Sequence, residues 1–591
     1  MPAAGLDPSW MLGLNQAIAQ GLAFGKDIIF SYGPYSSIYT EAYHPATSLM
    51  MTGGSLYLAF SWWVCLVFLM TGVQWRWILA LCICISGMIY ARDSLLFSYP
   101  LLVGLVTYKM LYSDRKLTSY APYFFTFLFA PFGLLPLVKA SLLIFCLVVL
   151  ALCFIYILAC KRINLAIICL MTPVISMLLF WIGSGQSPVN LPDFLINTVF
   201  MAGGFTEAMG LEGNPGEVIL YILGGVFICM SILCQKQIRP VSRLFIKSLF
   251  LVFLFFSFKS GFIRHNVHAF IPATSILMAA LILPFAFRSK MALPLVMFSV
   301  LIWAYIINHY TNISIFKNIL ANSTTTWHGV ESRFSDSNWL KQNYDLSIDF
   351  MKNQASLPVL QGTTDIYSCK QTHLIASGNT WSPRPIIQSY SAFSPMLARK
   401  NAQHLQGNTA PDNIIFRMEP IDGRIPSLED GASWPFLLAN YQPTHMDNDF
   451  VFLRKKNRLT TIPNLMVLKQ EKHYLQELVK VPGKGQLVFG EITIKPTLSG
   501  YMASTILKPG QLTIVFELAD GSRRPYRIIT NMAKSTFLIS PLVENTAEFA
   551  MLYRDENALN AKVVKAISIA ATSGSSWQWQ KEYSIQFKTQ H

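Results

Sequence analysis

The chain has 591 residues, of which 53% are hydrophobic and only 13% are charged, and its mean hydropathy is +0.41. Soluble domains average about 25% charged residues, so this composition excludes a single soluble domain and indicates a membrane protein. The net charge of +15 does not indicate nucleic acid as a partner, because no basic helix or aromatic-basic motif accompanies it.

The chain begins with a polar, turn-rich stretch, LDPSWMLGLNQAIAQGLAFGKDIIFSYGPY, before any apolar run. Residues 9–20 of this stretch are predicted to form a helix. Its small and apolar residues fall on one face: Trp10, Leu14, Ala17, Ile18 and Gly21. We expect that face to lie along the surface of a bilayer.

Two carboxylates, Asp7 and Asp27, flank this helix. In an external loop at the membrane surface, two ionised carboxylates suit a general base or the ligands of a metal ion. The alternative is that Asp7 caps the helix and that Asp27 is a solvated loop charge.

Ten apolar stretches follow, and a bilayer core about 30 Å thick requires roughly 20 apolar residues per helix. The candidate spans are residues 52–73, 77–91, 95–112, 119–137, 140–159, 164–182, 216–234, 244–262, 267–287 and 291–309. Basic residues fall in alternate loops: around Arg76, in SDRK at 113–116, in CKR at 160–162, in QKQIRPVSR at 235–243 and in RSK at 288–290. If these loops face the cytoplasm, the positive-inside rule holds throughout. Both termini and the C-terminal half then lie in the extracytoplasmic space.

The first 49 residues contain no signal peptide, since no basic segment precedes an apolar core. Either this polar tail crosses the membrane together with its first span, or the chain begins downstream of a natural start that encoded one more helix. We favour the second explanation as a hypothesis.

The sequence FKSGFIRHNVHAF occupies one predicted external loop at the end of a helix hairpin. It carries four basic side chains: Lys259, Arg264, His265 and His268. Basic groups at this depth suit a phosphate or pyrophosphate at the level of the lipid headgroups. Lys139 and Arg92 are further charges at predicted outer ends that would join this site. The alternatives are a structural interface with the exported region and a buried pair between Arg92 and its neighbour Asp93.

A long external loop at residues 185–215 contains Gln186, Asp193 and Glu207. Loops of this length are often functional. The predicted contacts to an acceptor sugar come from this loop and from the opening stretch: Trp10, Tyr32, Gln186 and Glu207.

From about residue 311 the composition becomes hydrophilic. We expect four parts in the chain: a first external loop with a surface helix at 1–49, a transmembrane domain at 50–310, an exported mixed α/β region at 311–480 and an exported antiparallel β-sandwich at 481–591. Helices are predicted at 394–405 and 426–441, and the strands include EFAMLY at 548–553.

Two segments of the exported half, at 381–395 and 421–434, are dense in Arg, Asp and aromatic residues. Aromatic rings beside carboxylates and amides are typical of carbohydrate sites. The alternative is that these are turn-rich loops packed by their own aromatic residues.

The opening stretch resembles the first external loop of the GT-C superfamily, polytopic glycosyltransferases that use polyprenyl-phosphate sugars. That loop carries an acidic residue, a surface helix, a Gly and a Pro-containing turn. The matching elements here are Asp7, the helix at 9–20, Gly21 and YGPY at 32–35. The chain departs from the pattern in having DPSW where many members have an Asp-Glu pair, and in lacking the preceding helix.

The resemblance implies an inverting glycosyltransferase in a bacterial inner membrane, with a lipid-linked sugar donor and a glycan or protein acceptor. Asp7 would be the catalytic base or would help to hold a divalent ion such as Mg²⁺ or Mn²⁺, and Asp27 would assist. The basic residues named above would bind the lipid phosphate. The alternative function is a non-enzymatic membrane component of surface polysaccharide assembly or transport, with an exported domain that binds glycan.

Overall fold

The computed structural model describes residues 1–112, 119–447, 449–457, 465–483, 485–554 and 558–590. The predicted basic loop SDRK lies outside these residues. The chain divides into two compact units. Unit 1 consists of Met1–Ser31, Val189–Ala208 and Asn343–His591, and unit 2 consists of Tyr32–Pro188 and Met209–Gln342.

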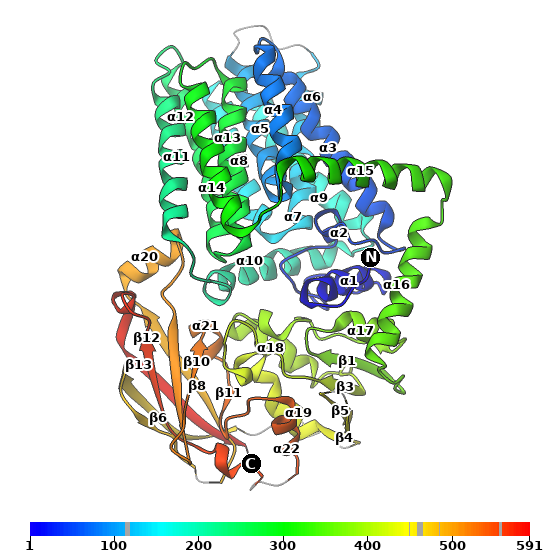
Figure 1. Ribbon diagram of the computed structural model, residues 1–591, viewed down its shortest axis with the longest axis vertical. Coiled ribbons are helices and arrows are strands. Elements are labelled where there is room, and N and C mark those ends of the chain that lie inside the picture. The colour runs from blue at the N-terminus through cyan, green and yellow to red at the C-terminus, as the bar shows by residue number, and fades with distance from the viewer. Residues whose placement is uncertain (113–118, 448, 458–464, 484, 555–557, 591) are drawn as a thin grey trace. The chain divides into compact units, whose positions relative to one another are not determined.

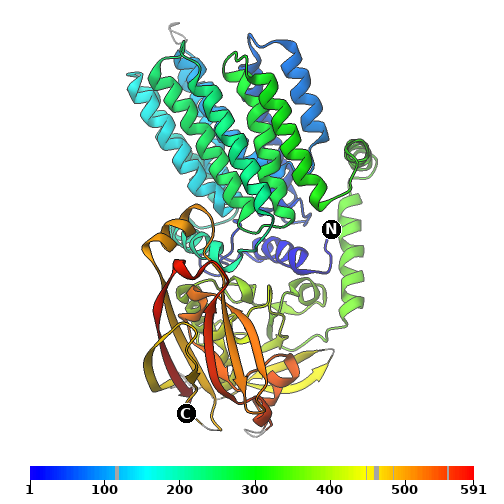
Figure 2. The same ribbon diagram turned by 60° about the vertical axis from the view of Figure 1, so that its left-hand side comes forward.

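Unit 2 is helical (Figures 1 and 2). Its helices are α2 (Ser36–Thr40), α3 (Ser48–Met70), α4 (Trp75–Gly87), α5 (Arg92–Tyr112), α6 (Ala121–Phe129), α7 (Pro131–Val138), α8 (Ala140–Ala159), α9 (Ile163–Gly183), α11 (Pro215–Leu233), α12 (Pro240–Phe262), η2 (Val267–Ala269), α13 (Phe270–Ala286), α14 (Ala292–Tyr310) and α15 (Ile315–Ser335). In the described part of the chain, nine helical stretches are long and apolar enough to cross a membrane, with α6 and α7 together forming one of them. By length and composition, these helices are compatible with an integral membrane protein.

The second candidate span, at 77–91, corresponds to α4, which has 13 residues. It is too short for the roughly 20 residues that a full span requires. In the described residues, nine of the ten candidate spans therefore correspond to helices long enough to cross a bilayer, and the one at 77–91 is a shorter apolar helix.

The helices of unit 2 pack as antiparallel neighbours around α13, whose residues are all buried. Short connections join α8 to α9, α11 to α12 and α13 to α14. Each of these pairs therefore reverses direction. Close packing is visible at Gly133 of α7, where an added Cβ atom would lie 2.3 Å from the backbone nitrogen of Met177 in α9.

Unit 1 contains a five-stranded mixed sheet in the order β2-β1-β3-β5-β4. Its strands are β1 (Thr363–Tyr367), β2 (Thr380–Trp381), β3 (Asn413–Phe416), β4 (Tyr441–Asp447) and β5 (Phe450–Lys455). Strands β2 and β3 run parallel to β1, whereas β5 pairs antiparallel with both β3 and β4. The helices of this region are α16 (Trp339–Ala355), α17 (Gln371–Ala376), α18 (Pro395–His404) and α19 (Trp434–Asn440).

Two four-stranded sheets follow, in the orders β10-β9-β12-β7 and β11-β8-β13-β6. Their strands are β6 (Leu465–Tyr474), β7 (Val479–Lys480), β8 (Val488–Pro496), β9 (Leu512–Leu518), β10 (Arg523–Ile528), β11 (Phe537–Ser540), β12 (Val564–Ala571) and β13 (Trp579–Gln590), with helices α20 (Leu498–Ile506), α21 (Thr530–Ala533) and α22 (Thr546–Met551) between them. All pairings within the two sheets are antiparallel. The predicted antiparallel β-rich C-terminal region is confirmed.

The strand predicted at 548–553 is wrong, because these residues belong to helix α22 and the turn after it. The side chain of Asn545 accepts a hydrogen bond from the backbone nitrogen of Glu548 at 2.9 Å. This N-terminal cap satisfies an otherwise unpaired helix donor and favours the helix over a strand.

The opening stretch belongs to unit 1 as far as Ser31, and the helix predicted at 9–20 is present as α1 (Leu6–Ala19). At Gly13 an added Cβ atom would lie 3.4 Å from both Trp381 and Ile387, so this side of α1 packs on protein. The backbone nitrogen of Ile29 donates to the carbonyl oxygen of Pro385 at 2.8 Å.

Helix α10 (Leu191–Ala208) also belongs to unit 1. The side chain of Asn197 donates to the carbonyl oxygen of Gly25 at 2.7 Å. Arg424 donates to the carbonyl oxygen of Ala208, also at 2.7 Å. Two segments predicted as external loops therefore fold together with the C-terminal half.

Candidate functional site

A group of charged and aromatic side chains gathers where α5 and α8 begin, and we call it the Tyr39 cluster: Tyr32, Tyr39, Arg92, Asp93 and Lys139. Lys139 Nζ lies 2.5 Å from Asp93 Oδ1, and the Tyr39 hydroxyl donates to Asp93 Oδ2 at 2.7 Å. Lys139 Nζ also donates to the Tyr39 hydroxyl oxygen at 3.2 Å. Asp93 thus has partners on both of its oxygens.

Both cations of the Tyr39 cluster lie over the ring of Tyr39. The Arg92 guanidinium carbon is 5.0 Å from the ring centroid, and Lys139 Nζ is 4.3 Å from it. Arg92 also donates to the Tyr39 carbonyl oxygen and lies 3.7 Å from Glu41 Oε1. Its side chain is 41% exposed, so Arg92 is the member of the cluster that an incoming anion can reach.

Burial raises the pKa of Tyr39, and the nearby Asp93 carboxylate adds to this rise against the opposing effect of Lys139. Burial likewise raises the pKa of Tyr32. Both hydroxyls therefore stay protonated at neutral pH and can act as hydrogen-bond donors.

A second group, the Glu217 cluster, consists of Glu217, His265, His309 and Tyr310. Glu217 is fully buried in the first turn of α11. Its Oε2 atom lies 2.8 Å from His265 Nε2 and accepts a hydrogen bond from the Tyr310 hydroxyl at 3.1 Å. Its Oε1 atom lies 2.7 Å from His309 Nδ1. A buried carboxylate needs such partners to offset its desolvation.

The local sequence explains how the Glu217 cluster forms. The side chain of Asn214 caps α11 by accepting from the nitrogen of Gly216 at 2.9 Å. Glu217 then lies in the first turn, where the helix dipole favours a negative charge. Gly213 allows the close approach of His265, because an added Cβ atom would lie 2.3 Å from that ring.

Aromatic contacts connect the Glu217 cluster to the segment that precedes α5. The ring of Tyr90, next but one to Arg92, lies 5.1 Å from that of Phe270, and Phe270 lies 5.8 Å from Tyr310. Tyr310 in turn donates to Glu217. Both clusters therefore lie at the same end of the helices of unit 2.

This arrangement supplies two kinds of chemistry. His309 has a side chain that is 48% exposed, and its Nδ1 atom lies 2.7 Å from Oε1 of the buried Glu217 carboxylate, without the geometry of a hydrogen bond. A carboxylate in this position orients an imidazole and stabilises its protonated form, which is what a general base requires. Arg92 and Lys139 supply positive charge of the kind that binds phosphate.

Among the residues predicted from sequence, Asp7 and Asp27 form local hydrogen bonds. Asp7 lies in the first turn of α1, where its Oδ1 atom accepts from Trp10 Nε1 at 3.0 Å. The Oδ2 atom of Asp27 accepts from the backbone nitrogen of Ala23 at 3.0 Å and closes a turn. Both carboxylates therefore have a local partner, although Asp7 lies inside α1 and does not cap it, and Asp27 is half-buried in a turn.

Three of the residues predicted to contact an acceptor sugar are buried or form hydrogen bonds within the protein. Trp10 and Gln186 are each 5% exposed. Glu207 accepts from the backbone nitrogens of Thr530 and Asn531. Burial raises the pKa of Glu207, while these hydrogen bonds oppose the rise.

The predicted phosphate-binding residues fall into separate places. Arg92 and Lys139 come together in the Tyr39 cluster with Tyr32, and His265 lies in the Glu217 cluster. Lys259 is in the last turn of α12. Arg264 pairs through its backbone with Leu211, and His268 Nδ1 lies 2.7 Å from Asn266 Oδ1.

The two aromatic segments of the C-terminal half lie in the interior of unit 1. Trp381, Tyr390 and Trp434 are buried. Arg384 is also fully buried, and lies 2.9 Å from Asp365 and 3.6 Å from Asp430. These segments form packed, turn-rich loops rather than open platforms for a sugar.

Sequence reasoning missed Tyr39, Glu217 and His309. The signal that would have found the last two is their position inside predicted spans, since ionisable residues there are rare and usually functional.

Within the described ranges, no group of three or more His, Cys, Asp or Glu side chains is arranged to hold a metal ion. Comparisons with protein-family models, with curated proteins and with solved structures give no match for this chain.

Proposed function

We propose that the protein is an integral membrane glycosyltransferase that moves a sugar from a polyprenyl-phosphate donor to an extracytoplasmic glycan or protein acceptor. The observation that carries this proposal is found at one end of the apolar helices. There the imidazole of His309 lies beside the carboxylate of Glu217, and the same end holds two cations of the kind that binds phosphate, Arg92 and Lys139. The resemblance of the opening stretch to GT-C enzymes supports the same function.

The proposed reaction is a single displacement with inversion. The acceptor hydroxyl forms a bond to the anomeric carbon as the bond from that carbon to the donor phosphate oxygen breaks. His309 takes up the hydroxyl proton, and Glu217 stabilises the imidazolium that results. Arg92 stabilises the charge that develops on the leaving phosphate, and Lys139, paired with Asp93, holds the ring of Tyr39 beside it.

The proposed topology places both clusters, the opening stretch and the C-terminal half outside the cytoplasm of a bacterial cell. The alternation of basic loops supports it. The membership of residues 1–31 and 189–208 in the same compact unit as the C-terminal half supports it as well.

The direct test incubates the purified full-length protein with a panel of polyprenyl-phosphate sugars and acceptors. Turnover is expected with one donor, and Arg92→Ala should lower kcat about 100-fold, because an electrostatic contact to the leaving group is lost. Lys161→Ala, which removes an exposed cation from the α8–α9 connection, is the matched control and should keep full activity. Absence of turnover with every donor would reject the proposal.

Two additions test the roles implied by the resemblance. Asp7→Asn should abolish turnover if Asp7 is the base, and should leave it unchanged if His309 is. EDTA should inhibit the enzyme only if a divalent ion such as Mg²⁺ or Mn²⁺ takes part.

The second candidate is a non-enzymatic component of surface polysaccharide assembly. It is favoured by the local hydrogen bonds of Asp7 and Asp27, which give both carboxylates a structural role. Binding of glycan to the intact protein without turnover of any donor would support this function.

A further inference from the structure

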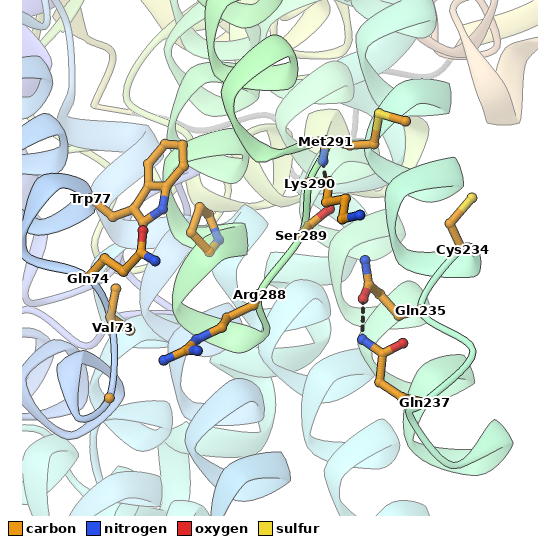
Figure 3. Close-up of a pocket in the computed structure, with 12 residues that line it drawn as sticks. Val73, Gln74, Trp77, Cys234, Gln235, Gln237, Arg288, Ser289, Lys290 and Met291 are labelled. Atoms are coloured by element: carbon orange, nitrogen blue, oxygen red, sulfur yellow. Dashed lines mark hydrogen bonds between the residues drawn. The ribbon is translucent and has the colours of Figure 1, made fainter.

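A cavity of about 600 Å³ lies at the end of the unit 2 helices opposite to the Glu217 cluster. It is bordered by the α3–α4 turn, by the end of α11 and by the connection from α13 to α14. Its polar and aromatic lining includes Trp77, Gln235, Gln237, Arg288, Ser289 and Lys290 (Figure 3).

The cavity has a positive lining without a compensating acid. Arg288 and Lys290 are exposed, and no carboxylate is among the residues that line the cavity. Within the described part of the chain, neither side chain forms an ion pair or a hydrogen bond. Two strong hydrogen-bond donors are therefore available to a ligand.

Two other cations at this end, Lys109 and Arg243, have a structural task. Lys109 donates to the carbonyl oxygens of Leu69 and Thr71 at 2.7 and 3.3 Å. Arg243 donates to those of Leu233 and Gln235 at 3.5 and 3.4 Å. These side chains cap helix C-termini, where positive charge is favourable. Arg288 and Lys290 have no such role.

The polar wall of the cavity is held in place by its own hydrogen bonds. Gln237 Nε2 donates to Gln235 Oε1 at 2.7 Å, and Gln235 Nε2 donates to the Ser231 carbonyl oxygen at 3.3 Å. The Ser289 hydroxyl lies 3.2 Å from that of Ser231 and accepts from the nitrogen of Met291 at 3.1 Å. A preformed polar wall lowers the entropy cost of binding.

Apolar side chains complete the lining. Trp77, Val73, Pro284 and Met291 border the same space, and Figure 3 shows Arg288 extending toward the side on which Val73 and Gln74 lie. The cavity opens where the apolar helices end, which is the level of lipid headgroups in a protein that spans the bilayer. Trp is typical of that level.

We propose that this cavity binds the phosphate headgroup of an anionic membrane lipid, with the phosphate at Arg288 and Lys290 and the start of the acyl chains along Trp77. Basic pockets between transmembrane helices bind such headgroups on the cytoplasmic side. The positive-inside pattern predicts that this end faces the cytoplasm, where anionic lipids are abundant. The proposal requires membrane insertion but does not depend on glycosyl transfer.

The test measures lipid retained by the purified full-length protein in native mass spectrometry, with phosphatidylglycerol and phosphatidylcholine as probes. The wild type should retain phosphatidylglycerol in preference to phosphatidylcholine. The double variant Arg288→Ala/Lys290→Ala should weaken that binding roughly thirty-fold, because each basic residue near the membrane surface contributes about fivefold. Equal retention by wild type and double variant would overturn the proposal.

The matched control is Lys161→Ala/Arg162→Ala, which removes two exposed cations from the α8–α9 connection. This control should bind phosphatidylglycerol as the wild type does. If it loses as much binding as Arg288→Ala/Lys290→Ala, the lipid is attracted by the overall positive charge, and the proposal of a defined site is overturned. Trp77→Ala keeps both cations and should weaken phosphatidylglycerol but not inorganic phosphate. If inorganic phosphate displaces the lipid fully and Trp77→Ala has no effect, the site is one for free phosphate and the lipid proposal fails.

Discussion

The Oε1 atom of Glu217 lies 2.7 Å from the Nδ1 atom of His309, and the pair joins a fully buried carboxylate to an imidazole that is 48% exposed. The two residues come from the start of α11 and the end of α14. The second oxygen of Glu217 is occupied by His265 and Tyr310. One oxygen of the carboxylate is thus held by His265 and Tyr310, and the other faces His309, the most exposed side chain of the cluster.

This pairing predicts that Glu217 and His309 act as one unit. His309→Gln and Glu217→Gln should each lower kcat by about 10²- to 10⁴-fold, because the proton acceptor is lost in one variant and misoriented in the other. The double variant should be no slower than the slower single variant, since residues that act together are not additive. The measurement is kcat with the donor identified in the panel.

The matched control for this prediction is His268→Gln. His268 is exposed and its ring contacts Asn266, so its loss should leave kcat unchanged. Additive losses in the double variant would contradict a joint role for Glu217 and His309.

A second prediction concerns the pair of Asp93 and Lys139. Their side chains are 10% and 17% exposed, so Lys139→Met leaves a nearly buried carboxylate without its cation. We expect a loss of about 3–5 kcal/mol in stability. Adding Asp93→Asn should recover most of that loss, because the uncompensated charge is gone. Thermal unfolding in detergent of the wild type, of Lys139→Met, of Asp93→Asn and of the double variant gives the coupling energy between the two side chains.

A coupling energy near zero would contradict this prediction. Lys161→Met, in the exposed α8–α9 connection, serves as the control for loss of a cation as such. It should change stability by less than about 0.5 kcal/mol.

The third prediction uses the buried carboxyl of Asp430. Burial raises its pKa to about 7, with Arg384 opposing the rise and Asp365 adding to it. A carboxyl whose folded pKa lies above its unfolded value contributes stability that is complete below the unfolded pKa and is lost as the pH rises through the folded one. The contribution of the Asp430 carboxyl to the stability of the wild-type protein should therefore fall as the pH rises from about 4 to about 7.

Asp430→Asn should make the melting temperature less sensitive to pH across this window, because the amide cannot ionise. The variant retains some pH dependence from Glu429, whose pKa burial also raises to about 7. Thermal unfolding of the full chain at several pH values measures the slope. A slope identical to that of the wild type would show that Asp430 does not take up a proton on folding.

Much of the helical part was predictable because hydropathy alone marks it. Helix α8 occupies 140–159, as predicted, since Lys139 and the CKR sequence bound an unbroken apolar run. Prediction failed where a local contact decided the structure. At 548–553 the apolar pattern suggested a strand, but the Asn545 cap started a helix.

The candidate site was predictable only in part. The basic residues at predicted helix ends included Arg92 and Lys139, which do converge. Their partner Tyr39 and the pair of Glu217 and His309 were missed. Those contacts depend on which helix lies beside which, and hydropathy carries no information about neighbours.

The last prediction concerns the turn that attaches the opening stretch to α10. Gly25 has a φ angle of +87°, and an added Cβ atom would lie 2.4 Å from the backbone of Phe194. Gly21 has a similar φ of +68° but no atom within 4 Å of an added Cβ. Both Gly→Ala variants carry the cost of a left-handed backbone, about 1 kcal/mol, whereas only Gly25→Ala also forces Phe194 away.

Gly25→Ala should therefore destabilise unit 1 clearly more than Gly21→Ala does. It should also weaken the hydrogen bond from Asn197 to the Gly25 carbonyl oxygen, which holds α10 to the opening stretch. Hydrogen exchange of residues 189–208 in the intact protein measures this directly, and faster exchange is expected in Gly25→Ala alone. Equal exchange in both variants would mean that the backbone angle, and not the contact with Phe194, limits the choice of residue at position 25.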